Sequence, residues 1–179
     1  KNIKEKSCAI VFMHSCKFNK HEREAEQVAK GLGLSHISLS YRTSQIMKYV
    51  MRGDTTVADA YLSPVLNKYI ENIYSAFEGD ISSKISFMQS NGGLTNANFF
   101  SGKDSILSGP AGGVIGGIKT SALDNEYKII GFDMGGTSTD VSHYAGEFER
   151  THETQVAGVR VRAPMIHIHT VAAGGGSIL

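Results

Sequence analysis

The first 45 residues combine short apolar runs with one helical spacing. The run Cys8–His14 is almost continuously apolar, which favours a strand buried on both faces, and His36–Ser40 predicts a second strand. Between them, Asn19 followed by Glu22 gives a cap-like spacing at the start of a helix, and Gly33 is placed where that helix would end. The apolar face expected for this helix contains Ala25, Val28, Ala29 and Leu32. The order strand–helix–strand predicts an α/β fold.

A second helical stretch is expected from Thr55 to about Phe77. Pro64 should break or kink it, and a new helix capped by Ser63 with Pro64 at its first position is the simplest solution. The expected apolar face contains Ala58, Tyr61, Leu62, Val65, Tyr69 and Ile73. Further along, Ile85–Gln89 predicts a strand that enters a tight turn at Ser90–Gly93.

The segment Ser108–Ala122 is rich in glycine, and Pro110 is suited to open a helix there. Each glycine inside a helix costs about 1 kcal/mol relative to alanine, so the missing side chains must serve a purpose. The pairs Gly112 with Gly116 and Gly113 with Gly117 would leave one side of the helix bare, so that a neighbouring backbone or a ligand can approach. A glycine-rich loop is the alternative.

The last third of the chain is expected to be nearly all strand. Lys128–Asp133 and Ser138–Tyr144 predict two antiparallel strands joined by a turn at Met134–Thr137, and Ala145-Gly146 turns the chain again. Three more extended segments are expected at Glu147–Arg150, Val156–Arg162 and Met165–Val171. A boundary between two subdomains is expected near residues 122–127.

Composition narrows the class of protein. The chain has 179 residues, of which 41% are hydrophobic and 20% charged, and its net charge is +1, as in a globular protein with no electrostatic preference for nucleic acid or anionic membrane. No apolar run reaches the roughly 18 residues of a membrane span. Two cysteines, Cys8 and Cys16, make neither a disulfide framework nor a zinc cage, so we expect a reducing, cytoplasmic environment and small buried side chains. The chain starts at Lys1 and ends soon after a glycine triplet, which suggests a piece of a longer protein.

The segment Gly131–Val141 carries the clearest chemical signal. Asp133 ends a strand, two glycines form a turn, two hydroxyls follow, and Asp140 lies on the returning strand. The backbone N–H groups of such a turn form an anion cradle, to which Thr137 and Ser138 can add hydroxyl donors. Carboxylates beside phosphates are tolerated when Mg²⁺ lies between them, so Asp133 and Asp140 are candidate magnesium ligands. An ordinary Asp/Gly hairpin is the alternative.

The order of elements around this hairpin points to one kind of ATPase. The chain lacks the Gly-x-x-x-x-Gly-Lys-Ser/Thr phosphate loop and the Gly-x-Gly-x-x-Gly dinucleotide fingerprint. A glycine-rich helix, a strand and then Asp-x-Gly-Gly-Thr in a hairpin resemble the actin, Hsp70 and sugar-kinase superfamily, in which two ribonuclease-H-like domains close on ATP. The resemblance implies a partial actin-like α/β fold with a mixed sheet and an antiparallel phosphate-binding hairpin.

Five motifs, in order along nearly the whole chain, resemble the hydantoinase A/5-oxoprolinase family. They are Ala58–Pro64, Met88–Leu94, Ser108–Val114, Gly131–Val141 and Val171–Ser177. Within the family, Phe12–Ser15 and Tyr144–Glu149 look most like the ATP-dependent 5-oxoprolinase type. The resemblance implies an enzyme that opens 5-oxo-L-proline to L-glutamate with ATP, Mg²⁺ and a monovalent cation such as K⁺, and that forms a homo-oligomer in its full-length form.

The resemblance also assigns roles to residues. Asp133 and Asp140 would be catalytic carboxylates that hold magnesium. The residues that would bind the nucleotide are Gly135, Gly136, Thr137, Ser138, Gly112, Gly113, Gly174, Gly175 and Gly176. Residues 1–124 would end one actin-like subdomain, including the crossing helix, and residues 125–179 would start the next. Because the first phosphate hairpin of the family is missing, the isolated chain is expected to be inactive.

Other functions remain open at this level. An ATP-dependent N-methylhydantoinase or an acetone carboxylase subunit shares the phosphate hairpin, and an Hsp70-like nucleotide-dependent binding module would have no small-molecule substrate. His14 and Ser15 lie where α/β sheets often place ligands. His167 and His169 would share one strand face, but no third metal ligand has a telling spacing, so a solvated face is the expectation.

Overall fold

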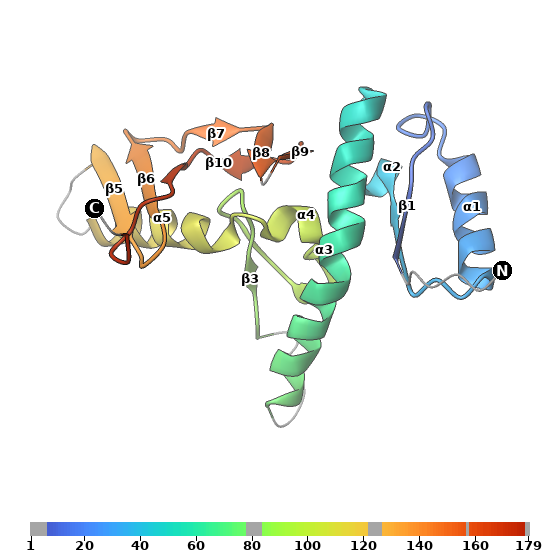
Figure 1. Cartoon of the computed structure of the whole chain (residues 1–179), viewed down its shortest axis with the longest axis horizontal. Helices are drawn as coiled ribbons and strands as arrows, with labels where there is room; N and C mark the ends of the chain where they lie inside the picture. Colours follow the sequence, from blue (N-terminus) through green and yellow to red (C-terminus); the bar gives the residue numbers. More distant parts are fainter. Residues whose placement is uncertain (1–6, 78–83, 122–126, 157, 178–179) are drawn as a thin grey trace. The chain divides into compact units, whose positions relative to one another are not determined.

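The computed structural model of the chain (Figure 1) describes residues 7–77, 84–121, 127–156 and 158–177 and has a mixed α/β fold. It contains two compact units. The first unit comprises Lys1–Ser86, Asn96–Lys103 and His152–Ala163, and the second comprises Phe87–Thr95, Asp104–Thr151 and Pro164–Leu179. The boundary expected near residues 122–127 falls mostly on residues outside the described ranges. No helix in the described part of the chain is both long and apolar enough to cross a membrane.

The first unit begins with the predicted strand–helix–strand order. Strands β1 (Ser7–Ile10) and β2 (His36–Leu39) pair in parallel, helix α1 (Lys20–Gly31) connects them, and the short helix α2 (Ser40–Thr43) follows. The first strand was expected to reach His14, but it ends at Ile10 and its residues are half-buried. The chain turns instead, because the His14 carbonyl accepts hydrogen bonds from the N–H groups of Lys17 and Phe18.

The buried face of α1 differs from the predicted one. Val28 and Leu32 are 65% and 60% exposed, whereas Glu22, Glu26 and Ala29 are buried. Glu22 is buried because its carboxylate serves the ends of both strands: Oε1 accepts from the Phe12 N–H at 2.8 Å and Oε2 from the Tyr41 N–H at 3.2 Å. Hydrogen-bond partners therefore decide which face of this helix turns inward.

Glu26 is the second acidic residue on this face. Its Oε1 is 2.8 Å from the Lys30 ammonium and 3.5 Å from the Arg42 guanidinium. The hydrogen bond from Lys30, with a smaller contribution from Arg42, lowers the pKa of Glu26 despite its burial.

Helix α3 (Tyr49–Ser75) is a single helix of 27 residues, drawn as the long green coil in Figure 1. The prediction that Pro64 separates two helices is wrong. A proline inside a helix has no N–H for the carbonyl four residues earlier, here that of Ala60. The Ser7 hydroxyl of β1 donates a hydrogen bond to the Ala60 carbonyl and so replaces the missing donor. This bond explains why the helix continues through the proline.

The predicted apolar face of α3 is also wrong in part. Ala58 is buried, but Tyr61 and Val65 are 78% and 70% exposed. The residues that α3 buries are largely polar: Met51, Arg52, Thr55, Thr56, Ala58, Asp59, Ala60, Ser63 and Ile70. Asp59, for example, accepts hydrogen bonds from the Ser38 hydroxyl at 2.7 Å and from the Lys103 N–H at 3.1 Å. The buried face of α3 therefore contains polar side chains that have hydrogen-bond partners, where the apolar periodicity predicted only apolar side chains.

A buried guanidinium joins three segments of the first unit. Arg52 is fully buried and donates from Nη2 to the carbonyls of Phe12 at 2.6 Å and Met13 at 2.9 Å. It also donates from Nη1 to the Ile46 carbonyl at 2.6 Å and from Nε to the Ser40 hydroxyl at 3.0 Å. The same Ser40 hydroxyl donates to Oε1 of the buried Glu22 at 2.6 Å, so one serine connects the two buried charges.

The rest of the first unit consists of short elements. They are the 3₁₀ turn η1 (Ala97–Phe99) and the strands β8 (Thr154–Val156) and β9 (Val159–Val161), while helix α4 (Gly102–Ser105) contains residues of both units. Val156–Arg162 was expected to be one strand. It is instead part of an antiparallel hairpin of β8 with β9, with Gly158 at a φ of +80° between the two strands.

The second unit is built on a three-stranded antiparallel sheet in the order β11–β6–β5. Its strands are β5 (Ile129–Met134), β6 (Thr139–Tyr144) and β11 (His169–Val171). Helix α5 (Ser108–Ser121) packs on β5 and β6, so the glycine-rich segment forms the predicted helix rather than a loop. The β5–β6 hairpin confirms the expected antiparallel pair.

Three predicted strands of this unit are shorter or interrupted. The strand expected at Ile85–Gln89 is only β3 (Phe87–Met88), which pairs with β4 (Leu94–Thr95). In place of Glu147–Arg150 the structure has β7 (Arg150–Thr151), paired with β10 (Met165–Ile166). The strand expected at Met165–Val171 is interrupted and forms β10 and β11. His167 lies between these two strands and its N–H donates to the Glu149 carbonyl at 2.8 Å, so His167 and His169 do not share one strand.

Candidate functional site

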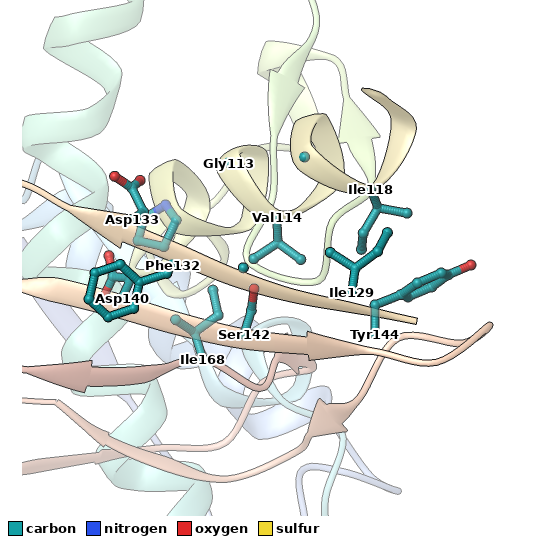
Figure 2. A pocket seen from close by; sticks show the side chains of 13 residues that line it. Gly113, Val114, Ile118, Ile129, Phe132, Asp133, Asp140, Ser142, Tyr144 and Ile168 are labelled. Atoms are coloured by element: carbon teal, nitrogen blue, oxygen red, sulfur yellow. The ribbon is translucent and has the colours of Figure 1, made fainter. Parts of the chain in front are cut away.

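A pocket of about 240 Å³ lies between α5 and one face of the β5–β6 hairpin, within the second unit (Figure 2). Gly113 and Gly117 of α5 form part of its wall, and Gly131 lies opposite on β5. The remaining lining residues are Pro110, Val114, Ile118, Ile129, Phe132, Asp133, Asp140, Ser142, Tyr144 and Ile168. The pocket is therefore mostly apolar, with two carboxylates among its lining residues.

Asp133 and Asp140 are direct partners in the β5–β6 register. Side chains of directly paired residues lie on the same face of a sheet with Cβ atoms about 5 Å apart, and like charges there repel each other. Asp140 Oδ1 accepts a hydrogen bond from the Thr170 hydroxyl at 2.6 Å, whereas Asp133 has no such partner among the described residues. The described residues that line the pocket include no lysine or arginine. Two adjacent carboxylates without a counter-charge fit a bound cation.

Residues of α5 approach Asp133 closely. A Cβ atom added at Gly113 would lie 3.7 Å from Asp133 Oδ2, so any larger side chain there would push against the carboxylate. No neighbouring backbone of the described residues lies within 4 Å of the missing Cβ positions of Gly112, Gly113, Gly116 and Gly117. Gly112 faces the Met88 side chain at 3.8 Å instead of the pocket. The bare side of the helix thus borders the pocket at Gly113 and Gly117. It is not packed against a neighbouring backbone among the described residues.

The turn between β5 and β6 is exposed and closes on itself. The Gly135 N–H donates to the Ser138 carbonyl at 2.9 Å. The Thr137 and Ser138 hydroxyls have no hydrogen-bond partner in the described part of the chain, so both remain available to a ligand. These observations fit the predicted anion cradle, and its use by phosphate stays a prediction.

The loop Gly174–Gly176 packs on this turn. The N–H groups of Gly175 and Gly176 donate to the carbonyls of Gly135 at 2.9 Å and Gly136 at 2.8 Å. A Cβ atom at Gly174 would lie 2.6 Å from the Gly135 carbonyl oxygen, which leaves no room for a side chain. The contact that the glycine triplet makes here is with backbone of the hairpin.

The other sequence candidates have structural explanations. Asn91–Gly93 forms a tight turn, with Gly92 at a φ of +83° and its N–H bonded to the Gln89 carbonyl at 2.9 Å. His14 is exposed, whereas Ser15 is buried and within 2.9 Å of the Ser40 hydroxyl. Cys8 and Cys16 are half-buried free thiols.

Two clusters were missed by sequence reasoning. The first is the buried Arg52–Ser40–Glu22 network, for which the sequence pattern gave no signal, because Arg52 precedes the helical stretch expected from Thr55. The second is Glu149, whose Oε1 lies 2.7 Å from His143 Nδ1 and whose Oε2 lies 3.5 Å from His167 Nδ1. His143 and then His167 hold the pKa of Glu149 below its ordinary value. In the described residues no group of three or more His, Cys, Asp or Glu side chains is arranged to hold a metal ion.

Comparison with known proteins identifies the family. The family model described as Hydantoinase/oxoprolinase matches residues 52–179, which include α5, the hairpin and the glycine triplet. The chain belongs to the hydantoinase/oxoprolinase family. It is 51% identical over 176 residues to a 5-oxoprolinase of Saccharomyces cerevisiae, a match that covers 97% of this chain and 14% of the yeast protein.

Two solved structures have a similar fold over most of this chain. An ATP-dependent caprolactamase from Pseudomonas jessenii superposes with a TM-score of 0.77 at 32% identity, over 96% of this chain and 26% of that one. A nucleotide-free acetone carboxylase gives a TM-score of 0.71 at 25% identity, over 93% and 24% of the two chains. The chain therefore spans only a small part of the proteins it resembles.

Proposed function

We propose that this chain supplies part of the ATP site of a 5-oxoprolinase, an enzyme that opens 5-oxo-L-proline to L-glutamate while ATP is hydrolysed to ADP and phosphate. The observation that carries the proposal is the pair Asp133 and Asp140 beside a turn with free hydroxyl groups. The 51% identity to a 5-oxoprolinase supports the substrate, and the ATP-dependent reactions of the two structural relatives, a caprolactamase and an acetone carboxylase, support the use of ATP.

The residues present fit a magnesium ion bound together with phosphates. Mg²⁺ is commonly held by one or two carboxylates with water and phosphate oxygens completing its coordination, and the pocket offers two carboxylates that otherwise repel each other. In the proposal Asp133 and Asp140 hold the ion, which neutralises the charge of the phosphates. A monovalent cation such as K⁺ belongs to the proposal only through the family resemblance.

In the proposal the β5–β6 turn binds the phosphates. Gly135 and Gly136 let the backbone approach closely, and the Thr137 and Ser138 hydroxyls donate to phosphate oxygens. A pocket of about 240 Å³ is smaller than those that enclose drug-sized ligands. It suits the ion and the phosphate end of a nucleotide, and the rest of ATP would bind to other parts of the full-length protein.

The chemistry requires ATP because a lactam carbonyl is a poor electrophile. Transfer of the γ-phosphoryl group to the lactam oxygen releases ADP and makes the ring carbon open to attack by water. Catalysis of such a transfer is mostly positioning and neutralisation of charge, which agrees with a site built from glycines, hydroxyls and carboxylates.

The finer fold is part of the same proposal. The order α5, β5, turn and β6 supports an actin-like arrangement. A division into one subdomain that ends at residue 124 and another that starts at residue 125 is part of the proposal, although contacts group α5 with β5 and β6 in one compact unit. In the full-length protein the substrate is a small cyclic amide, and the protein is a homo-oligomer.

The test is phosphate release by the full-length protein with Mg²⁺ and ATP, with and without 5-oxo-L-proline. We expect release to depend on 5-oxo-L-proline and Asp133→Asn to lower it by about two orders of magnitude or more. The matched control is Asp54→Asn on α3 of the first unit, which should leave the rate unchanged.

Two results would contradict the proposal. Release that ignores 5-oxo-L-proline but responds to caprolactam or N-methylhydantoin would move the substrate to another cyclic amide. Phosphate release that Asp133→Asn leaves unchanged at every Mg²⁺ concentration would contradict the proposal that Asp133 holds Mg²⁺.

A further inference from the structure

We infer that the loop Gly174–Gly176 is a positioning element that aims two backbone N–H groups of the β5–β6 turn outward as an anion cradle. This inference rests on the proposed function, since it deepens the phosphate role of the same turn. It differs from the expectation that the glycine triplet itself approaches the nucleotide.

The direction of the N–H groups follows from the carbonyls. In a trans peptide the C=O and the following N–H point in opposite directions, and no cis peptide is present in the described chain. The Gly135 and Gly136 carbonyls both point toward the loop, where they accept hydrogen bonds from Gly175 and Gly176. The next N–H groups, those of Gly136 and Thr137, must therefore point away from the loop.

Two successive N–H groups that point the same way form an anion-binding concavity. Neither N–H has a hydrogen-bond partner among the described residues, and both residues are exposed. The Thr137 hydroxyl belongs to the same turn and is also free. The loop thus orients these donors by binding the other side of the same peptides.

The loop Gly174–Gly176 is held by hydrogen bonds within itself and by one bond from β6. The Gly174 N–H donates to the Ser177 hydroxyl at 3.0 Å, and the Ser177 N–H donates to the Gly174 carbonyl at 2.9 Å. The Thr139 hydroxyl of β6 donates to the Ala173 carbonyl at 2.6 Å, and Thr139 is buried. The Thr139 bond ties the loop to the strand that follows the turn, and the two bonds between Gly174 and Ser177 close the loop on itself.

The glycines differ in what they tolerate, which provides matched variants. A Cβ at Gly174 or Gly176 would lie 2.6 Å or 2.9 Å from carbonyl oxygens of the turn, and backbone atoms cannot rotate away. A Cβ at Gly175 would meet the Gly135 carbonyl oxygen at 3.8 Å, an ordinary contact. Alanine at position 174 or 176 should therefore force the loop off the turn, whereas alanine at 175 fits.

The experiment measures binding of MgADP to the full-length protein by calorimetry. Gly174→Ala and Gly176→Ala should each weaken binding about tenfold or more, because donors aimed at a charged phosphate are lost, and Gly175→Ala should remain within about twofold of the unaltered protein. Thr139→Val is a milder variant in case Gly174→Ala fails to fold. It should weaken binding, and Thr139→Ser, which keeps the hydroxyl, should restore it.

Hydrogen exchange read by mass spectrometry tests the same contact without nucleotide. In the unaltered protein the amides of Gly175 and Gly176 should be protected, and Gly174→Ala should remove that protection.

Each other outcome would overturn the inference in a recognisable way. If Gly175→Ala weakens binding as much as Gly174→Ala, the triplet contacts the nucleotide directly. If all three variants bind MgADP like the unaltered protein, the loop does not position the turn. If the unaltered protein itself does not bind MgADP, the proposed ATP site fails and the cradle fails with it, whatever the exchange pattern.

Discussion

The buried guanidinium of Arg52 offers the sharpest test of what holds the first unit together. Replacing Arg52 by methionine keeps much of the side-chain volume but removes every donor. The carbonyls of Phe12, Met13 and Ile46 then lose their bonds of 2.6–2.9 Å, and the buried Glu22 loses the nearby positive charge. Removing one member of a buried charged network typically costs about 3–5 kcal/mol, so we expect a loss of that size.

Hydrogen exchange of the full-length protein is the suitable assay, because a large protein does not unfold in a single two-state step. A loss of about 3–5 kcal/mol corresponds to a decrease of roughly two to four orders of magnitude in amide protection, measured on peptides from β1, α2 and the start of α3. Arg42→Met is the matched control, because the Arg42 side chain is largely exposed and its partner Glu26 keeps the closer ion pair with Lys30, so protection should change by less than about tenfold. Equal effects of the two variants would refute the importance assigned to the buried network.

Three smaller effects follow from other contacts. Ser7→Ala should lower the amide protection of α3 by roughly fivefold, which corresponds to about 1 kcal/mol, but have little effect when Pro64→Ala restores the helical N–H; additive effects would contradict the replacement of the donor. Gly131→Ala should destabilise the hairpin because its Cβ would meet the Ser142 hydroxyl and force that side chain to rotate away, and Ser142→Ala should relieve this; a double variant no better than the single one would count against the clash. Glu26→Gln should reduce stability at neutral pH, and the difference should vanish as the pH falls below about 4.5 through the lowered pKa, because a carboxylate stabilised in the folded state loses that advantage when protonated. A difference that does not change with pH in thermal unfolding would exclude the ion pair as its cause.

The elements around the site were the most predictable from sequence. The β5–β6 hairpin follows from two short extended segments on both sides of two adjacent glycines, and these are local signals that need no knowledge of the rest of the fold. The glycine-rich helix was also predicted, although four glycines oppose it, because the pairs at i and i+4 suggested a use for the bare side. Only the structure shows that this side borders a pocket at Gly113 and Gly117.

The helix faces of the first unit were the least predictable. Periodicity assumes that apolar residues turn inward, but α1 buries Glu22 and Glu26 and α3 buries Arg52 and Asp59. Glu22, Arg52 and Asp59 are stable inside because their partners come from distant segments, such as the Phe12 N–H for Glu22. A sequence read window by window contains no such information. The same holds for Pro64, whose helix survives through a serine 57 positions earlier.

The bonds between the loop Gly174–Gly176 and the β5–β6 turn also have a consequence for synthesis of the protein. The turn leaves the ribosome about forty residues before the loop that shapes it, a delay of roughly two to eight seconds at ordinary elongation rates. During this interval the hairpin can pair its strands, but the peptide planes of Gly135 and Gly136 have no partner to orient them. A nascent chain should thus gain phosphate affinity only after residue 176 has emerged, so a ribosome stalled earlier would display a folded but binding-incompetent hairpin.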